Sequence, residues 1–170
     1  MTFKSPKDLF LLLLSNVRHG TERSTKIYKE LNEIAEDKEV KEILDARVFL
    51  SDKILATLDE VFKIIGEKPV KTSGRLHDVF VEDFRRELEQ IEGPVARRLF
   101  ALAKAQHLIH LRIGEYQALI AAADMTGNYE VGLLLESCLA DKMVMVERVR
   151  RLIRHLVENR VTAKKAAMSA

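Results

Sequence analysis

The chain has 170 residues, of which 47% are hydrophobic and 32% charged, and its formal net charge is +2. This length suits one domain with a hydrophobic core, and the near-neutral charge excludes a general attraction to nucleic acid or acidic substrates. A single cysteine excludes an intrachain disulfide and fits a reducing compartment, and the longest apolar run, residues 9–14, is too short to cross a membrane. We therefore expect a cytoplasmic protein without a membrane segment.

The first helix is predicted to begin after Ser5, with Pro6 at its first position. A serine N-cap, a proline at the first helical residue and an acid three residues after the cap are typical of a helix start. Apolar residues then recur every three or four positions to about Ala35, interrupted by the hydroxyl residues Thr21 and Ser24.

The second helix is predicted to start after Asp37 and to end at Gly66, since Pro69 lies just beyond. Its apolar face has the same spacing, and Arg47 falls in the middle of that face. A connection over residues 67–74 should follow.

A shorter helix is expected over residues 75–90, with Leu76, Val79, Phe80 and Phe84 to bury. Gly93 and Pro94 open a long helix that ends at residues 126–128. Arg112 lies on the apolar face of this helix, where an unpaired charge would cost several kcal/mol if buried. The last helix is predicted over residues 129–159.

Four helices of this length, without any strand pattern, predict an all-α fold. The long connection with its own short helix suits a crossover between distant corners of a bundle. We therefore predict a ferritin-like up-down four-helix bundle with a long crossover that contains an extra short helix. It forms a single domain over residues 5–160, followed by a disordered tail over residues 161–170.

Three segments resemble the YciE/YciF family of bacterial ferritin-like stress proteins. They are DLFLLLLS at residues 8–15, LDEVFKIIGEKP at 58–69 and AQHLIHLRIGEYQAL at 105–119. The resemblance covers residues 8–159 and implies a bundle whose interior carboxylates and histidines are placed as in di-iron proteins.

The positions that correspond to these ligands are mostly changed in this chain. In the first helix the resemblance implies Tyr-x-Ala-Glu, and the chain has Arg18-His19-Gly20-Thr21; in the second it implies His-Leu-Glu-Glu, and the chain has Arg47-Val48-Phe49-Leu50. In the third helix it implies Glu-His-Tyr-Glu, and the chain has Ile109-His110-Leu111-Arg112. In the fourth it implies Leu-x-Glu-Glu, and the chain has Leu139-Ala140-Asp141-Lys142. His110 and Asp141 are retained and little else is, so the resemblance implies a degenerate metal site.

Positive side chains are expected to replace the positive ions of such a site. A guanidinium stays charged in a protein and fills the space and the charge that a metal would supply. Arg47 and Arg112 would then form internal ion pairs with Asp141, Glu22 or Glu115. Alternatively, both arginines lie at the margins of their apolar faces and reach solvent.

A rearranged metal site is the alternative, because a di-iron or di-manganese centre needs clustered carboxylates and imidazoles. The residues that could form it are His19, Glu22, His107, His110, Glu115 and Asp141. His107 and His110 share one helical face, which is an acceptable but common spacing.

Other reactive side chains have simpler interpretations. Cys138 should be a small core residue, and His77 should lie at the surface. Tyr28 and Tyr116 should be packing residues whose hydroxyls find a partner. The basic run between Arg148 and Lys165 is interpreted as a solvated helix end, with binding to a polyanion as the alternative.

The sequence thus predicts a non-catalytic bundle without cofactors, with a structural or interaction role in stress response. We expect a homodimer, with the protein partner unknown and no nucleic acid or membrane bound. The alternative is an enzyme, an iron-handling protein or di-metal oxidoreductase that binds iron or manganese through a rearranged ligand set.

Overall fold

The computed structural model describes residues 4–35 and 38–168, which form five helices and no strand. These helices are α1 (Pro6–Ile34), α2 (Lys38–Ile64), α3 (Arg75–Leu88), α4 (Pro94–Met125) and α5 (Tyr129–Met168). None of them combines the length and apolarity that crossing a bilayer requires.

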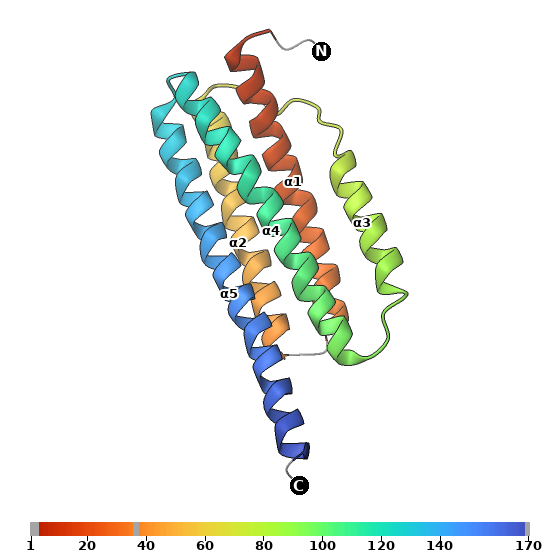
Figure 1. The fold of residues 1–170 in the computed structure, drawn as a ribbon. Coiled ribbons are helices and arrows are strands. Elements are labelled where there is room, and N and C mark those ends of the chain that lie inside the picture. Colours follow the sequence, from red (N-terminus) through yellow and green to blue (C-terminus); the bar gives the residue numbers. More distant parts are fainter. Residues whose placement is uncertain (1–3, 36–37, 169–170) are drawn as a thin grey trace.

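The four long helices form one bundle, and α3 lies outside it beside α1 (Figure 1). Helix α1 packs against α2 and α4, and α5 packs against α4 and α2. Because the connection through α3 returns the chain to the end where α1 finishes, α4 runs parallel to α2 (Figure 1). The ferritin-like up-down bundle with a long crossover is therefore confirmed.

Local chemistry explains where α1 starts. The Ser5 hydroxyl accepts a hydrogen bond from the Asp8 amide at 3.1 Å, and the Asp8 carboxylate accepts one from the Ser5 amide at 3.1 Å. This reciprocal capping box satisfies two backbone donors that would otherwise have no helical partner. Further on, the Ser15 hydroxyl accepts a 3.0 Å bond from the Val70 amide, which fixes the α2–α3 connection to α1.

Two elements differ from the sequence expectation. The backbone of α5 continues to Met168, past the expected end near residue 159, because no glycine or proline follows to stop it. In α3 the exposed fractions of Leu76 and Val79 are 56% and 44%, so Phe84 and His77 are the residues that this short helix buries.

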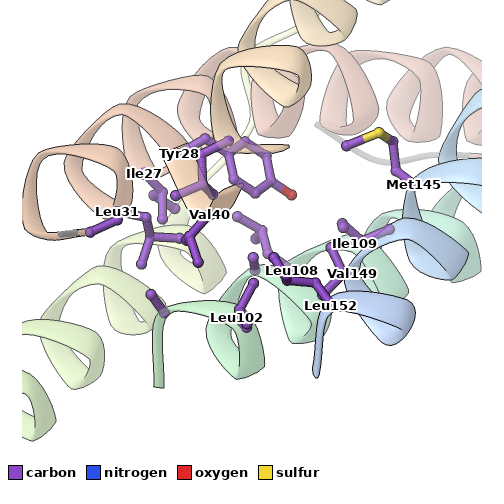
Figure 2. Close-up of a cluster of buried hydrophobic side chains, with 14 of the residues drawn as sticks. Ile27, Tyr28, Leu31, Val40, Leu102, Leu108, Ile109, Met145, Val149 and Leu152 are labelled. Carbon is purple, nitrogen blue, oxygen red and sulfur yellow. The ribbon is translucent and has the colours of Figure 1, made fainter. Parts of the chain in front are cut away.

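The core consists of two hydrophobic clusters, one toward each end of the bundle. The first contains residues from α1, α2, α4 and α5 around Tyr28, Val40, Leu108 and Val149, as Figure 2 shows. In Figure 2 the Tyr28 hydroxyl is directed away from Ile27 on the same helix. The second cluster draws on the same four helices.

Along α1, α2 and α5 a gap of several residues separates the two clusters. In α1, for example, the second cluster ends at Val17 and the first begins at Ile27. Buried polar side chains of α1, α2 and α5 lie in these gaps, and Arg112 of α4 lies close to where the two clusters meet, between Ile113 and Tyr116. Seven residues share this level of the bundle: Thr21, Ser24 and Thr25 of α1, Arg47 and Ser51 of α2, Arg112 of α4 and Lys142 of α5. We call these seven residues the polar layer. It occupies the centre of the bundle.

Candidate functional site: a buried cationic layer

Three cationic side chains lie inside the polar layer. The exposed fractions of Arg47, Arg112 and Lys142 are 2%, 0% and 0%. Each comes from a different helix, so the three charges are held together by tertiary packing rather than by local sequence. Burying several like charges costs several kcal/mol unless counter-charges or hydrogen bonds compensate.

Arg112 reaches from α4 to α1. Its guanidinium forms an ion pair with the Glu115 carboxylate one turn along α4, and its Nη1 lies 3.5 Å from the Val17 carbonyl oxygen. Gly20 makes this approach possible, because a Cβ atom there would overlap the guanidinium. Burial, with a further contribution from Arg47, lowers the pKa of Arg112 to about 10, so the group remains charged at neutral pH.

Arg47 and Lys142 each lie over a tyrosine ring. The Arg47 Cζ atom is 5.1 Å from the centroid of Tyr28, and the Lys142 Nζ atom is 4.7 Å from the centroid of Tyr116. The electron-rich face of an aromatic ring attracts a cation, by about 2 kcal/mol or more when water is excluded. Both tyrosines are buried, and their rings therefore serve as uncharged partners for the two cations.

Burial and charge repulsion both act on Lys142. Its pKa lies well below the usual value of 10.5, first because the ammonium is buried and then because Arg47 and Arg112 repel it. Burial in turn raises the pKa of the Tyr116 hydroxyl, although Arg112 opposes that shift. Both shifts have burial as their largest cause.

The residues considered as internal ion-pair partners lie at different depths. Glu115 contacts Arg112, whereas the Asp141 carboxylate lies 3.1 Å from Lys53 Nζ and faces outward from the bundle with a side-chain exposure of 33%. Glu22 is exposed and lies 3.7 Å from Arg18 Nη1. Only Glu115, among these three, brings a negative charge to the buried cations.

The histidines that could have ligated a metal do not converge. His107 and His110 are exposed. His19 accepts a 3.0 Å hydrogen bond from Arg23 Nε, and its ring lies against Gly74 at the start of α3. In residues 4–35 and 38–168, no group of three or more His, Cys, Asp or Glu side chains is arranged to hold a metal ion.

His77 corrects a sequence expectation, because it is buried, with an exposed fraction of 5%. Burial, together with Arg112, Arg23 and His19, lowers its pKa to about 4, so the imidazole is neutral at physiological pH. His77, His110 and Glu115 line a pocket of about 570 Å³ between α1, α4 and the start of α3. Glu115 thus lies between this open pocket and the buried Arg112.

The tyrosines and Cys138 complete the site. Tyr28 and Tyr116 are buried as expected, but neither hydroxyl has a partner with hydrogen-bonding geometry in the described part of the chain. The Tyr116 hydroxyl lies beside Thr21. Cys138 is a core residue, and burial raises the pKa of its thiol.

Comparison with known proteins agrees with this fold. A family model described as a domain of unknown function, DUF892, matches residues 5–162. The chain belongs to this family. No curated protein matches the sequence.

Solved structures with the same fold include the Escherichia coli stress protein YciF, with a TM-score of 0.86 and 19% identity over 91% of this chain and 98% of that one. YcfI, a putative structural protein from Rhodopseudomonas palustris, has a TM-score of 0.83 and 22% identity over 87% and 94% of the two chains. A protein from Xanthomonas campestris has a TM-score of 0.74 and 15% identity over 95% and 99%. The resemblance to the YciE/YciF family is therefore confirmed. Sequence identities this low show a common fold and do not show a common function.

Sequence reasoning missed Lys142, which stands at the second acidic position of the fourth motif. The signal was present, because Lys142 continues the inward spacing of Leu135, Cys138, Met145 and Val149 along α5. A lysine at the edge of an apolar pattern normally extends its flexible side chain to solvent. For this reason the spacing alone did not lead to a prediction that Lys142 is buried.

Proposed function

We propose that this protein is a non-catalytic, metal-free bundle with a structural or interaction role. The observation that carries the proposal is the burial of Arg47, Arg112 and Lys142 at the centre of the bundle, with exposed fractions of 0–2%. They stand at positions where the resemblance implies di-iron ligands. Their positive charges take the place of the charge that metal ions supply in a di-iron site.

The donor set of the layer does not fit a metal. Hard cations take oxygen and imidazole ligands, but the layer offers hydroxyls that donate to backbone carbonyls, three cationic groups and Glu115 at its edge. A divalent ion placed about 6 Å from one guanidinium would be repelled by roughly 5 kcal/mol at an effective dielectric constant of about 20. Several such charges act together here.

A homodimer is part of this proposal. Phe49 of α2 and Val144 of α5 have exposed fractions of 75% and 59%, and both line a groove between these helices with Leu50 and Met145. Apolar side chains gathered at one groove suit contact with a second copy. We expect light scattering to give twice the 19.4 kDa chain mass, and Phe49→Glu to return it to a single chain.

The cellular setting is also proposed. The single free cysteine and the lack of a membrane-spanning helix in the described residues support a cytoplasmic location. The Escherichia coli protein of the same fold is a stress protein, which supports a role for this chain under stress. The partner is expected to be a protein rather than a nucleic acid.

The experiment that tests the proposal is metal loading. The protein is purified without chelators, offered ferrous iron, manganese or zinc under anaerobic conditions, and analysed by elemental mass spectrometry. We expect near-zero stoichiometry and an unchanged melting temperature. One or two ions per chain, lost in His110→Gln and Asp141→Asn but retained in the surface control Lys53→Met, would favour the iron-handling alternative.

A further inference from the structure

Several buried polar atoms in the polar layer and in the two tyrosines beside it have no hydrogen-bond partner within the described residues. In the layer these atoms are Nε and Nη1 of Arg47, Nε of Arg112 and Nζ of Lys142, and beside it they are the hydroxyls of Tyr28 and Tyr116. Each of these six atoms can donate a hydrogen bond. Leaving a buried donor without a partner costs about 1–3 kcal/mol, and more when the group is charged.

Neighbouring hydroxyls do not neutralise the cations. Thr21, Ser24 and Ser51 donate to the carbonyl oxygens of Val17, Gly20 and Arg47 at distances of 2.7–2.9 Å, in each case four residues back in the same helix. Their oxygens can still accept a bond, but they carry no charge. They therefore leave the positive charge of the layer unbalanced.

Carboxylates balance only part of the charge. Glu115 pairs with Arg112, whereas neither Arg47 nor Lys142 forms an ion pair within the described residues. Asp141 is the next residue to Lys142, but its carboxylate pairs with Lys53 at the surface. The tyrosine rings attract both cations through their faces, and this contact leaves the N–H and O–H donors unpaired.

We infer that the polar layer binds one small inorganic anion, of the size of chloride or nitrate, between Arg47, Arg112 and Lys142. The three cations supply charge, and the hydroxyls of Tyr28 and Tyr116 supply neutral donors. The ion must be small because every group around it has an exposed fraction of 2% or less. Buried water would satisfy the donors, but it would leave the excess positive charge in place.

A bound anion would raise the lowered pKa of Lys142. Repulsion from Arg47 and Arg112 is among the causes that lower it, and an anion between these groups offsets that repulsion. The inference rests on the proposed function, since a metal at the same place would exclude an anion. Metal loading and anion binding are measured separately, so either one can fail alone.

The first test measures thermal unfolding of the full chain in sodium gluconate and in sodium chloride at equal ionic strength. Gluconate is too large for the enclosed layer. We expect chloride to raise the melting temperature by about 3–6 °C, with saturation, since a ligand at tenfold its dissociation constant stabilises a protein of this size by about that much.

Two variants make the test specific. Lys142→Met removes one buried cation and should abolish the chloride effect, whereas Lys53→Met removes an exposed lysine and should preserve it. Equal melting temperatures of the wild type in the two salts, or the same chloride effect in Lys142→Met, would overturn the inference.

The second test does not depend on any variant. Crystals of the wild type are grown in sodium bromide, and anomalous diffraction is recorded at the bromine edge. We expect one peak within hydrogen-bonding distance of Arg47 and Lys142. A layer filled by water alone, or bromide confined to the molecular surface, would contradict the inference.

Discussion

Gly20 and Arg112 fit together across the interface between α1 and α4. The guanidinium of Arg112 occupies the space that a side chain at position 20 would fill, and it approaches the Val17 carbonyl oxygen one turn earlier in α1. A glycine inside a helix normally costs about 1 kcal/mol relative to alanine. Here the missing side chain allows a buried cation to reach the opposite helix.

Gly20→Ala is therefore expected to destabilise the fold, although alanine is the better helix former. Displacing the guanidinium should lower the free energy of unfolding by about 1–3 kcal/mol, as overpacking of a tight core does. Gly114→Ala in α4 is the matched control, since a Cβ there meets nothing within 4 Å, and it should raise stability by up to about 1 kcal/mol. Urea unfolding measures both. A stabilised Gly20→Ala variant would show that the contact is not formed.

Lys142→Met tests the cost of the buried ammonium. Because the folded-state pKa lies below 10.5, the unfolded chain binds more protons as the pH falls toward neutrality, and the wild type loses stability in that direction. In gluconate buffer at pH 7, the variant should be more stable than the wild type by about 1–3 kcal/mol. This difference should shrink as the pH rises to 10.

The pH series stops at 10 for a physical reason. The pKa of Tyr116 is raised above its usual value of 10.0, so the unfolded chain releases that proton first at higher pH and stability falls again. The prediction for Lys142 fails if the two proteins differ by the same free energy at every pH between 7 and 10.

His77 should control stability in acid. Its folded-state pKa of about 4 lies below the usual 6.5, so stability is complete above pH 6.5 and is lost as the pH falls toward 4. The wild type should lose up to about 3 kcal/mol across this window, and His77→Phe should lose less. His107→Phe, at an exposed position, is the control and should behave like the wild type. Identical acid curves for His77→Phe and the wild type would argue against a buried neutral imidazole.

The two ion pairs near the layer should differ in strength. Glu115→Gln leaves the buried Arg112 without its counter-charge and should cost about 2–4 kcal/mol. Asp141→Asn breaks a pair whose side chains are 60% and 33% exposed, and it should cost less than about 1 kcal/mol. Chemical denaturation measures both losses. A larger loss for Asp141→Asn would mean that Asp141 belongs to the interior.

The sequence predicted the helices well because their ends carry local signals. Ser5 and Pro6 at the start of α1 and Gly66 after α2 specify backbone conformations that depend on few other residues. The end of α5 was predicted less well, since residues after 159 are good helix formers without a stop signal.

The site was predictable only in part. The spacing placed Arg47 and Arg112 on inward faces, and both are buried. The spacing did not reveal that Asp141 turns outward to Lys53 while its neighbour Lys142 turns inward to Tyr116. Adjacent helical positions point about 100° apart, and which one faces the core depends on the packing of all four helices.

The proposal that the polar layer holds no metal is tested most directly by a crystal structure of the wild type grown anaerobically with ferrous iron or manganese, with anomalous data at both metal edges. The account predicts density for Arg47, Arg112 and Lys142 at the centre of the bundle and no anomalous peak there. A metal peak at about 2.0–2.3 Å from a carboxylate or imidazole inside the bundle would contradict it.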